Sequence, residues 1–267
     1  MAMTRRATMA GISAGLLLLG CSVGAPTKSE PKPESAPVSA TSADADADAD
    51  ATTTAEAIGL LRGGTAFVNQ TSYRSDVDIA SQVTSLSHTD NVHKRLTAKV
   101  AAPGGAIEIR MIDDEVYMKT SLFRGVGDGW MVLDPARVPS DFGLSFAPGK
   151  NDSGGSGRLI DAIVTARADG PEISGTIDAT RIAAGNGISF RPGPGGVFPD
   201  SARRHAFRAS LDTEGRLVSF LMPEAGGLPN ASLRYSDFGT TVTVARPPGA
   251  VAAPDALYPQ LGLGGGK

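Results

Sequence analysis

Alternation of apolar and polar residues with a period of two recurs along the middle of the chain and constrains its fold more than any other feature. In the first run Tyr73, Val77 and Ile79 share one face, and charged residues occupy the other. Asp113 and Asp114 separate the last two runs as a hairpin turn would. The runs cover residues 73–79, 95–100, 107–111 and 116–119. We therefore expect four consecutive antiparallel strands with one apolar face.

The second half of the chain continues this pattern after a stretch rich in Pro and Gly. Gly215 and Gly239 fall where tight reversals need a residue that tolerates positive φ. One helix is expected near Thr53, which has the spacing of a capping box with Glu56, and a second over residues 157–168, where apolar residues recur four apart. Further strands are expected at residues 173–179, 205–212, 216–222, 231–237 and 240–245.

These elements predict an α+β domain built on one large curved antiparallel sheet, a half-barrel of about ten strands with a few helices covering its concave face. Aromatic residues make up only 5% of the chain, whereas Gly (33 residues) and Pro (18 residues) are frequent. That composition is typical of a turn-rich domain with an aliphatic core. Because two helices are a thin cover for so much sheet, we expect a cavity or groove beneath them.

The N-terminus has the pattern of an exported bacterial lipoprotein. Arg5 and Arg6 precede a short uncharged run at residues 9–19, which suits a signal peptide and is too short to span a bilayer. Residues 18–21, Leu-Leu-Gly-Cys, resemble a lipobox, and Cys21 is the only cysteine. We expect cleavage before Cys21 and acylation of its thiol, which would anchor the protein to the cell membrane on the extracytoplasmic side.

Residues 22–55 are rich in Pro, Ser, Ala, Thr and charged residues and contain no aromatic residue. Such a segment buries too little apolar surface to fold, so it is expected to be a disordered tether. Its alternating Asp residues do not form a calcium loop, because the positions that need Gly and Glu hold Ala49 and Ala55. The expected parts are a signal peptide (1–20), a lipidated N-terminus with the tether (21–55), a globular domain (56–248) and a loosely packed C-terminal tail (249–267).

Several short patterns resemble the actinobacterial LppX/LprG-type lipoproteins. They are the lipobox, the tether, the Val-Tyr-Met-Lys sequence at residues 116–119, Trp130, the Tyr-Ser-Asp-Phe-Gly sequence at 235–239, Val-Thr-Val at 242–244 and the Pro pair at 247–248. The resemblance implies the LolA-like half-barrel fold. It also implies carriage of a lipid or another amphiphile, with acyl chains held in an apolar cavity. The Gly/Pro-rich stretch at 185–196 departs from that pattern.

No convergent set of catalytic residues is apparent, so an enzyme, a metal site and a cofactor are not expected. Residues 154–158, Gly-Gly-Ser-Gly-Arg, depart from a nucleophile elbow at the last position. His88 and His93 lie in a polar segment, expected to be a solvated loop, with no third metal ligand beyond Asp90. His205 lies beside two arginines, as an exposed edge charge or as a contact for an anionic headgroup.

The apolar face of the predicted sheet is the candidate ligand-binding surface. Its residues are Val77, Ile79, Leu96, Val100, Ile107, Ile109, Met111, Val116, Met118, Phe207, Leu211, Val218, Phe220, Leu233 and Tyr235. Each of them also fits a core packed beneath the helices. An acyl chain buried there would gain about 0.8 kcal/mol per methylene.

The expected function is binding or carriage of a lipid-like amphiphile at the cell envelope. The alternative is a surface module with a filled core that binds another envelope protein and no lipid. With 25 basic against 28 acidic residues, the chain lacks the basic excess that neutralises phosphates, so nucleic acid is not an expected partner.

Overall fold

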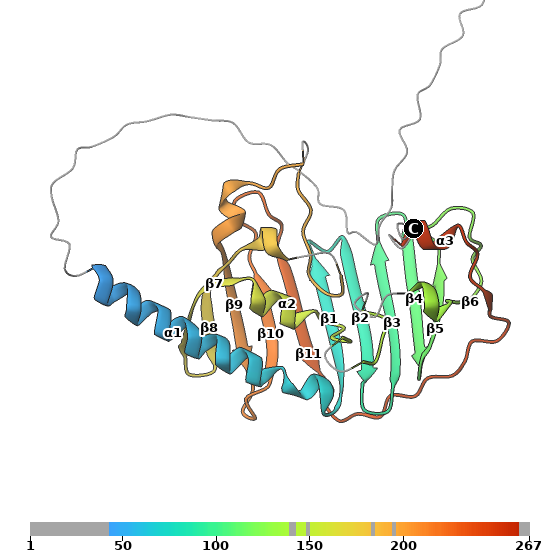
Figure 1. The fold of residues 1–267 in the computed structure, drawn as a ribbon, viewed down its shortest axis with the longest axis horizontal. Coiled ribbons are helices and arrows are strands. Elements are labelled where there is room, and N and C mark those ends of the chain that lie inside the picture. The colour runs from blue at the N-terminus through green and yellow to red at the C-terminus, as the bar shows by residue number, and fades with distance from the viewer. Residues whose placement is uncertain (1–42, 139–142, 148–149, 183–184, 194–195, 262–267) are drawn as a thin grey trace, which may run out of the picture.

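The computed structural model describes residues 43–138, 143–147, 150–182, 185–193 and 196–261, so the predicted signal peptide, Cys21 and most of the predicted tether lie outside it. One open sheet of twelve strands dominates the fold, in the order β12-β6-β5-β4-β3-β2-β1-β11-β10-β9-β8-β7 (Figure 1). Neighbouring strands are antiparallel, except that β12 pairs with β6 in parallel. The predicted fold class, a curved half-barrel sheet with few helices, is confirmed.

The elements follow the sequence pattern closely in β1, β3, β4 and β5. The strands are β1 (Ser72–Ile79), β2 (Val83–Asp90), β3 (Arg95–Ala102), β4 (Gly105–Ile112), β5 (Glu115–Thr120), β6 (Met131–Val132), β7 (Ile163–Asp169), β8 (Glu172–Ile177), β9 (His205–Leu211), β10 (Leu217–Met222), β11 (Ala231–Ser236) and β12 (Val251–Ala252). The helices are α1 (Ala43–Gly64), α2 (Ser156–Asp161) and α3 (Leu257–Gln260), with four short 3-10 helices, η1 (Ala66–Asn69), η2 (Pro135–Arg137), η3 (Ala179–Arg181) and η4 (Asp200–Arg204). The predicted reversals are confirmed, since Asp113, Gly215 and Gly239 have φ values of 55°, 77° and 78°.

Helix α1 is longer than the sequence predicts. It begins at Ala43, inside the segment expected to be a tether, so the capping box predicted at Thr53 is wrong and that residue lies mid-helix. Alanine has the highest helix propensity, which favours helix in the Ala-Asp repeat. The Thr54 hydroxyl donates to Ala166 O (3.3 Å) and accepts from Ala166 N (3.1 Å). The helix thereby covers the edge of β7, which would otherwise expose unpaired backbone groups.

Two predicted elements differ in the middle of the chain. The segment with His88, expected to be a solvated loop, forms β2, because Val83, Ser87 and Thr89 alternate inward although two of them are polar. The helix predicted over residues 157–168 ends at Asp161, and β7 follows. The β-branched residues of that second half, Ile163, Val164 and Thr165, favour strand.

The C-terminal part also differs from expectation. Residues 240–245 form no strand and cross the outer face of the sheet, where Arg110 donates to Ala245 O (3.1 Å) and Arg246 to Glu115 (2.6 Å). Residues 249–261 are not a loosely packed tail, because β12 extends the sheet and Leu257 of α3 is fully buried. Apolar side chains in this short segment complete the core at the edge of the sheet.

Two apolar clusters lie on the inner face of the sheet. The first lies beneath α1 and α2, which cross this face in Figure 1, and contains the stacked rings of Phe207 and Phe220, 5.0 Å apart. The second lies on β3 to β6 and is closed by Phe123, Phe146 and the short helix α3. Helical cover is therefore confined largely to one half of the sheet, and irregular segments cover the other half.

Candidate functional site

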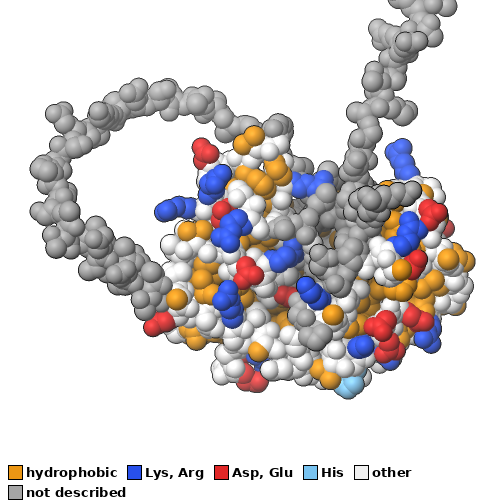
Figure 2. All heavy atoms as spheres, viewed as in Figure 1, with side chains coloured by type: hydrophobic (Ala, Val, Ile, Leu, Met, Phe, Trp, Pro, Cys, Tyr) orange, Lys and Arg blue, Asp and Glu red, His pale blue; other side chains and the backbone are white. Residues whose placement is uncertain are grey.

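A pocket of about 240 Å³ opens into the second apolar cluster. Its strand residues are Met111 of β4 and Val116 of β5. The remaining apolar lining comes from Leu133, Pro135, Val138, Leu144 and Phe146, and the polar lining from Asp113, Asp114 and Ser145. Figure 2 shows apolar side chains reaching the surface at the right-hand end of this face, where β5 and β6 lie. Most of the residues that line the pocket are therefore apolar.

The polar edge of this pocket carries balanced charge. Asp113 pairs with Arg95 (3.0 Å), and Asp114 pairs with Lys94 (3.6 Å). Asp113 and Asp114 are largely exposed, so these ion pairs lie in water and contribute little to stability. A ligand entering past them meets no strong excess of either sign.

The structure divides the predicted cavity-lining residues between the two clusters. Leu96, Ile107, Ile109, Met111, Val116 and Met118 lie in the second cluster, and Val77, Ile79, Phe207, Phe220, Leu233 and Tyr235 in the first. Val100 packs against both clusters, Leu211 packs against the first, and Val218 lies at a bulge of β10 and belongs to neither. Of the whole predicted set, Met111 and Val116 line the apolar pocket.

A cluster of buried hydroxyl groups separates the two apolar clusters. Ser75 of β1 and Ser87 and Thr89 of β2 face inward, where aliphatic residues would continue the apolar face. Ser153 inserts its hydroxyl between them from the loop before α2. Its Oγ accepts from Ser87 (2.8 Å) and Thr89 (3.0 Å) and donates to the Tyr73 hydroxyl (3.4 Å). Ser75 lies 2.7 Å from Ser87 and completes the network.

Asp152 holds this loop in place. Its carboxylate accepts hydrogen bonds from the backbone N–H groups of Gly154, Gly155 and Gly157 and from the Ser156 hydroxyl. The Tyr235 hydroxyl also donates to it, at 2.7 Å. Negative charge is favourable at a helix N-terminus, so Asp152 stabilises the start of α2 as well as the loop.

Two phenols adjoin this network. Burial raises the pKa of Tyr73 well above its usual value, because desolvation disfavours the phenolate, and the charge of Asp152 raises it further. Burial and the same carboxylate raise the pKa of Tyr235. Both rings also pack edge-on against Phe67, at 5.3 Å and 5.0 Å between centroids. Both phenols are therefore neutral hydrogen-bonding groups at physiological pH.

The outer face of the sheet carries a groove of about 760 Å³. It runs across β11, β1, β2 and β3, and its charged lining residues are Asp76, Asp78, Lys99 and Arg234. Leu86 is a large apolar side chain in this groove and is 38% exposed. The lining of the groove combines charged, hydroxyl-bearing and apolar side chains.

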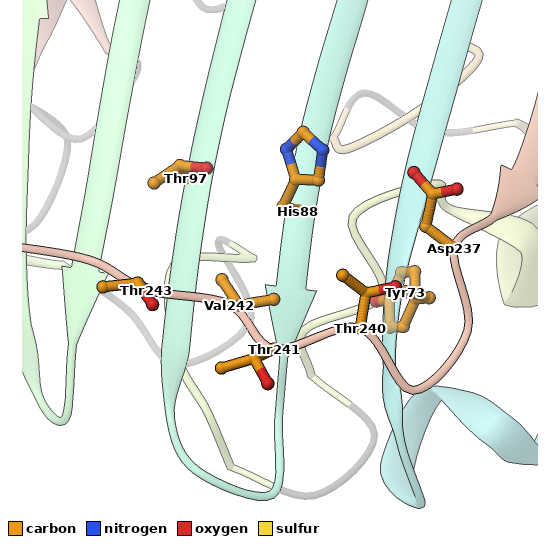
Figure 3. Close-up of a pocket in the computed structure, with 8 residues that line it drawn as sticks. All are labelled: Tyr73, His88, Thr97, Asp237, Thr240, Thr241, Val242 and Thr243. Carbon is orange, nitrogen blue, oxygen red and sulfur yellow. The ribbon is translucent and has the colours of Figure 1, made fainter.

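A smaller groove of about 230 Å³ lies where residues 240–243 cross the outer face. Figure 3 shows this crossing, with His88 and Thr97 on neighbouring strands and Asp237 beside them. The Ser72 hydroxyl donates to Thr240 O (2.6 Å) and fixes the start of the crossing segment. This groove offers hydroxyl and carboxylate groups.

The three histidines have different surroundings. His93 Nδ1 lies 2.8 Å from Asp90, at the end of β2. His205 begins β9 as predicted but is buried, with Nε2 2.8 Å from Pro223 O, so it is not an exposed edge charge. Within the described part of the chain, no group of three or more His, Cys, Asp or Glu residues is close enough to hold a metal ion. No described helix is long and apolar enough to cross a membrane.

No protein-family model matches the sequence, and no curated protein matches it. The solved structures that resemble it include the Mycobacterium tuberculosis lipoprotein LppX, at 15% identity and a TM-score of 0.34, over 76% of this chain and 100% of that one. A DUF1329 family protein from Desulfovibrio piger matches at 10% identity and a TM-score of 0.21, over 72% and 95%. The first belongs to the lipoprotein group that the sequence resembles. Both TM-scores are low, and neither match determines a ligand.

Sequence reasoning missed most of the pocket and all of the hydroxyl cluster. The pocket walls come from a Pro/Gly-rich stretch in which Leu133, Leu144 and Phe146 show no periodicity. The hydroxyl cluster depends on β2, whose polar residues gave no apolar alternation. Isolated apolar residues within a Pro-rich segment were the one available signal for the pocket walls.

Proposed function

We propose that this protein is a lipid-anchored, non-enzymatic protein of the cell envelope that binds the apolar chain of an amphiphile in the pocket on β4 and β5. The observation that carries the proposal is the pocket itself, most of whose lining residues are apolar and whose two carboxylates are exposed and paired with basic residues. Concave apolar sites with a few polar groups at one end are typical of small-molecule binding.

The position of the pocket supports this role. It lies in the half of the sheet covered by irregular segments, whereas the half under α1 and α2 is filled by tightly packed side chains. Irregular segments open at lower free energy than a packed helical core, which favours ligand entry here. At about 240 Å³ the pocket approaches the lower end of ordinary ligand sites, which fits one hydrocarbon chain better than several.

The anchoring and the absence of catalysis are parts of the same proposal. Acylation of Cys21 follows from the lipobox pattern, and residue 21 precedes the start of α1 at Ala43. Ser156, the serine of the near nucleophile motif at residues 154–158, is fully buried, and its hydroxyl donates to the Asp152 carboxylate (2.7 Å). A buried serine offers no access to a substrate, so this arrangement supports binding rather than hydrolysis.

Filling the pocket tests the proposal. Val116→Phe places a ring in the pocket, and Leu86→Phe makes the same kind of enlargement on the exposed outer face. We expect the full-length chain with Cys21→Ser to bind dodecyl maltoside below its micellar concentration, and Val116→Phe to weaken binding at least about tenfold, or 1.4 kcal/mol. Leu86→Phe should leave it unchanged. Equal binding by both variants in calorimetry would refute the site.

The outer groove favours a second candidate function, recognition of another envelope protein. Its mixed charges, Asp76, Asp78, Lys99 and Arg234, suit a polar protein surface better than a lipid chain. This candidate predicts a protein partner whose binding is lost in Lys99→Glu and unaffected by Val116→Phe. The pocket function predicts that Val116→Phe weakens amphiphile binding and that Lys99→Glu leaves it unchanged.

A further inference from the structure

The segment that crosses the outer face, residues 240–246, is stretched almost to its full length. At its start the Ser72 hydroxyl of β1 donates to Thr240 O (2.6 Å), and at its end Arg246 donates to Glu115 of β5 (2.6 Å). Strands β1 and β5 are four strand spacings apart, which is about 19 Å at ~4.8 Å each. A chain in β-conformation covers about 20 Å between residues 240 and 246. This crossing segment is therefore extended like a β-strand, at a large angle to the strands beneath it (Figure 3).

Burial along the crossing segment alternates as it does in a strand. Val242 and Val244 are half-buried, whereas Thr241, Thr243 and Ala245 are exposed. Side chains of a strand point alternately to its two faces, and its backbone N–H and C=O groups point sideways between them. The backbone groups of the crossing segment therefore point parallel to the outer face of the sheet, where a second strand could lie beside them.

These backbone groups have no partner in the described part of the chain. No described residue bonds to the backbone N–H or C=O groups of residues 241–244, although Arg110 donates to Ala245 O next to them. Unpaired strand edges are templates for other chains, and proteins usually block them with Lys, with Pro or with a covering element. Residues 240–246 contain neither Lys nor Pro, and their Thr and Val residues favour strand. The crossing segment thus has an open hydrogen-bonding edge.

The sheet provides a floor for a strand at this edge. The crossing segment lies over the row of His88, Thr97 and Arg110, which are opposite one another on β2, β3 and β4. The next row on the outer face is two residues further along each strand, or about 6.7 Å away. An added strand would lie about 4.8 Å from the crossing segment and would cover this second row. The row consists of Asp76, Leu86, Lys99, Glu108 and Lys119.

The side chains of this second row determine which strand fits. Leu86 is apolar and 38% exposed, so it favours an apolar side chain above it. Lys119 is three strands further along the row, about 14 Å from Leu86. The inward side chain four residues further along an added strand reaches the same distance, so an acidic residue there would meet Lys119. Lys99 and Glu108 lie between these two positions and have opposite charges, which favours a neutral residue over them.

We propose that the crossing segment binds an extended segment of another polypeptide by strand addition. The partner carries an apolar residue over Leu86 and, four positions away, an acidic residue near Lys119. Backbone hydrogen bonds to residues 241–244 would supply affinity, and the second row would supply specificity. The inference specifies how the outer groove, which includes Asp76, Leu86 and Lys99, would recognise a protein. It does not depend on amphiphile binding in the pocket.

Amide hydrogen exchange detected by NMR tests strand addition directly. The protein is the full-length chain with Cys21→Ser, and the probe is the capped peptide Thr-Leu-Thr-Val-Thr-Glu-Thr, whose Leu and Glu have the required spacing. Without peptide, the amides of residues 241–244 should exchange at least about 100-fold faster than those of β3. At about 90% occupancy, alternate amides in this segment should exchange about tenfold more slowly, because only the free fraction exchanges. Amides that are already protected without peptide would contradict the open edge.

Two modified peptides separate backbone pairing from side-chain contacts. Successive N–H groups of a strand point to opposite edges, so the Leu, Val and Glu amides share one edge and the Thr amides share the other. N-methylation of one set should abolish binding, and N-methylation of the other set should be tolerated, because only one edge faces the crossing segment. Equal affinities of the two methylated peptides would overturn strand addition.

A matched pair of protein variants tests the floor. Leu86→Lys should weaken binding of the unmodified peptide at least about tenfold, because the apolar contact is lost. Leu221→Lys is the control, since Leu221 is 39% exposed but lies on β10, three strands from β2, and it should leave binding unchanged. Equal binding by both variants would refute the proposed register.

Two results would overturn the inference as a whole. One is a peptide that fails to bind at millimolar concentration, and the other is a peptide that binds without slowing exchange in residues 241–244. Both results leave amphiphile binding intact, because Val116→Phe tests the pocket on the opposite face separately. Failure of strand addition is therefore distinguishable from failure of the proposed function.

Discussion

Replacement of Asp152 by Ala should destabilise the protein by about 2–4 kcal/mol. The variant removes an acceptor for three backbone N–H groups, for Ser156 and for the Tyr235 hydroxyl. Loss of a cap at the start of a helix costs about 1 kcal/mol. The buried Tyr235 hydroxyl would lose its strongest acceptor, which costs about 1–3 kcal/mol more.

Urea unfolding followed by circular dichroism measures this change. We expect a lower midpoint with an unchanged m-value, because the surface exposed on unfolding stays the same. Asp152→Asn is the matched control, since it keeps one carbonyl oxygen and the shape of the side chain, and it should lie between Asp152→Ala and the wild type. An Asp152→Ala variant within about 0.5 kcal/mol of the wild type would show that the network does not hold the loop.

Two further predictions concern the same region. Gly187→Ala should destabilise the protein by at least about 1.5 kcal/mol more than Gly215→Ala in urea unfolding. Both glycines have positive φ, but only at Gly187 would an added Cβ lie 1.9 Å from Gly154 O. Equal effects of the two substitutions would contradict this close approach. Burial raises the pKa of Tyr73 and Tyr235 in the folded protein. Above about pH 10 the unfolded chain ionises these tyrosines, whereas the folded protein keeps them neutral, so the free energy of unfolding should fall. Tyr73→Phe should flatten this fall in unfolding measured between about pH 8 and 11, and an unchanged slope would refute the argument.

The sheet was predictable where one physical requirement dominated. In β1, β3, β4 and β5 a single buried face demands apolar residues at every second position, and the side chains of Val77, Leu96 and Ile109 follow that rule. The turn at Asp113 was predictable for a similar reason, since few residues accept positive φ. Local sequence therefore determined both the strands and their connections in this half.

Elements whose stability depends on distant partners were not predictable. Strand β2 carries Ser87 and Thr89 on its inner face, and their burial is satisfied by Ser153, which lies far along the chain. Residues 240–245 alternate like a strand but form none. They cross β2 to β5, whose backbone groups are already paired with neighbouring strands, so no free sheet edge lies there. Tertiary contacts outweigh local propensity in both cases.

The sequence predicted the chemical character of the candidate site but not its position in the fold. The sequence indicated an apolar inner face under a thin cover, and Met111 and Val116 are the residues where that face meets the pocket. Which part of the face is filled depends on α1 and α2, and their packing is not encoded in the strand pattern. The walls at Leu133 and Phe146 come from segments without a repeating pattern, whose position depends on the folded core.

Native mass spectrometry of the full-length chain with Cys21→Ser, purified from a bacterial envelope and followed by organic extraction, tests the central claim most directly. We predict one acyl-containing molecule per protein, lost in Val116→Phe and retained in Leu86→Phe. A ligand-free mass for the wild type, together with failure to take up added dodecyl maltoside, would contradict the proposed amphiphile-binding function and favour the protein-binding surface on the outer face.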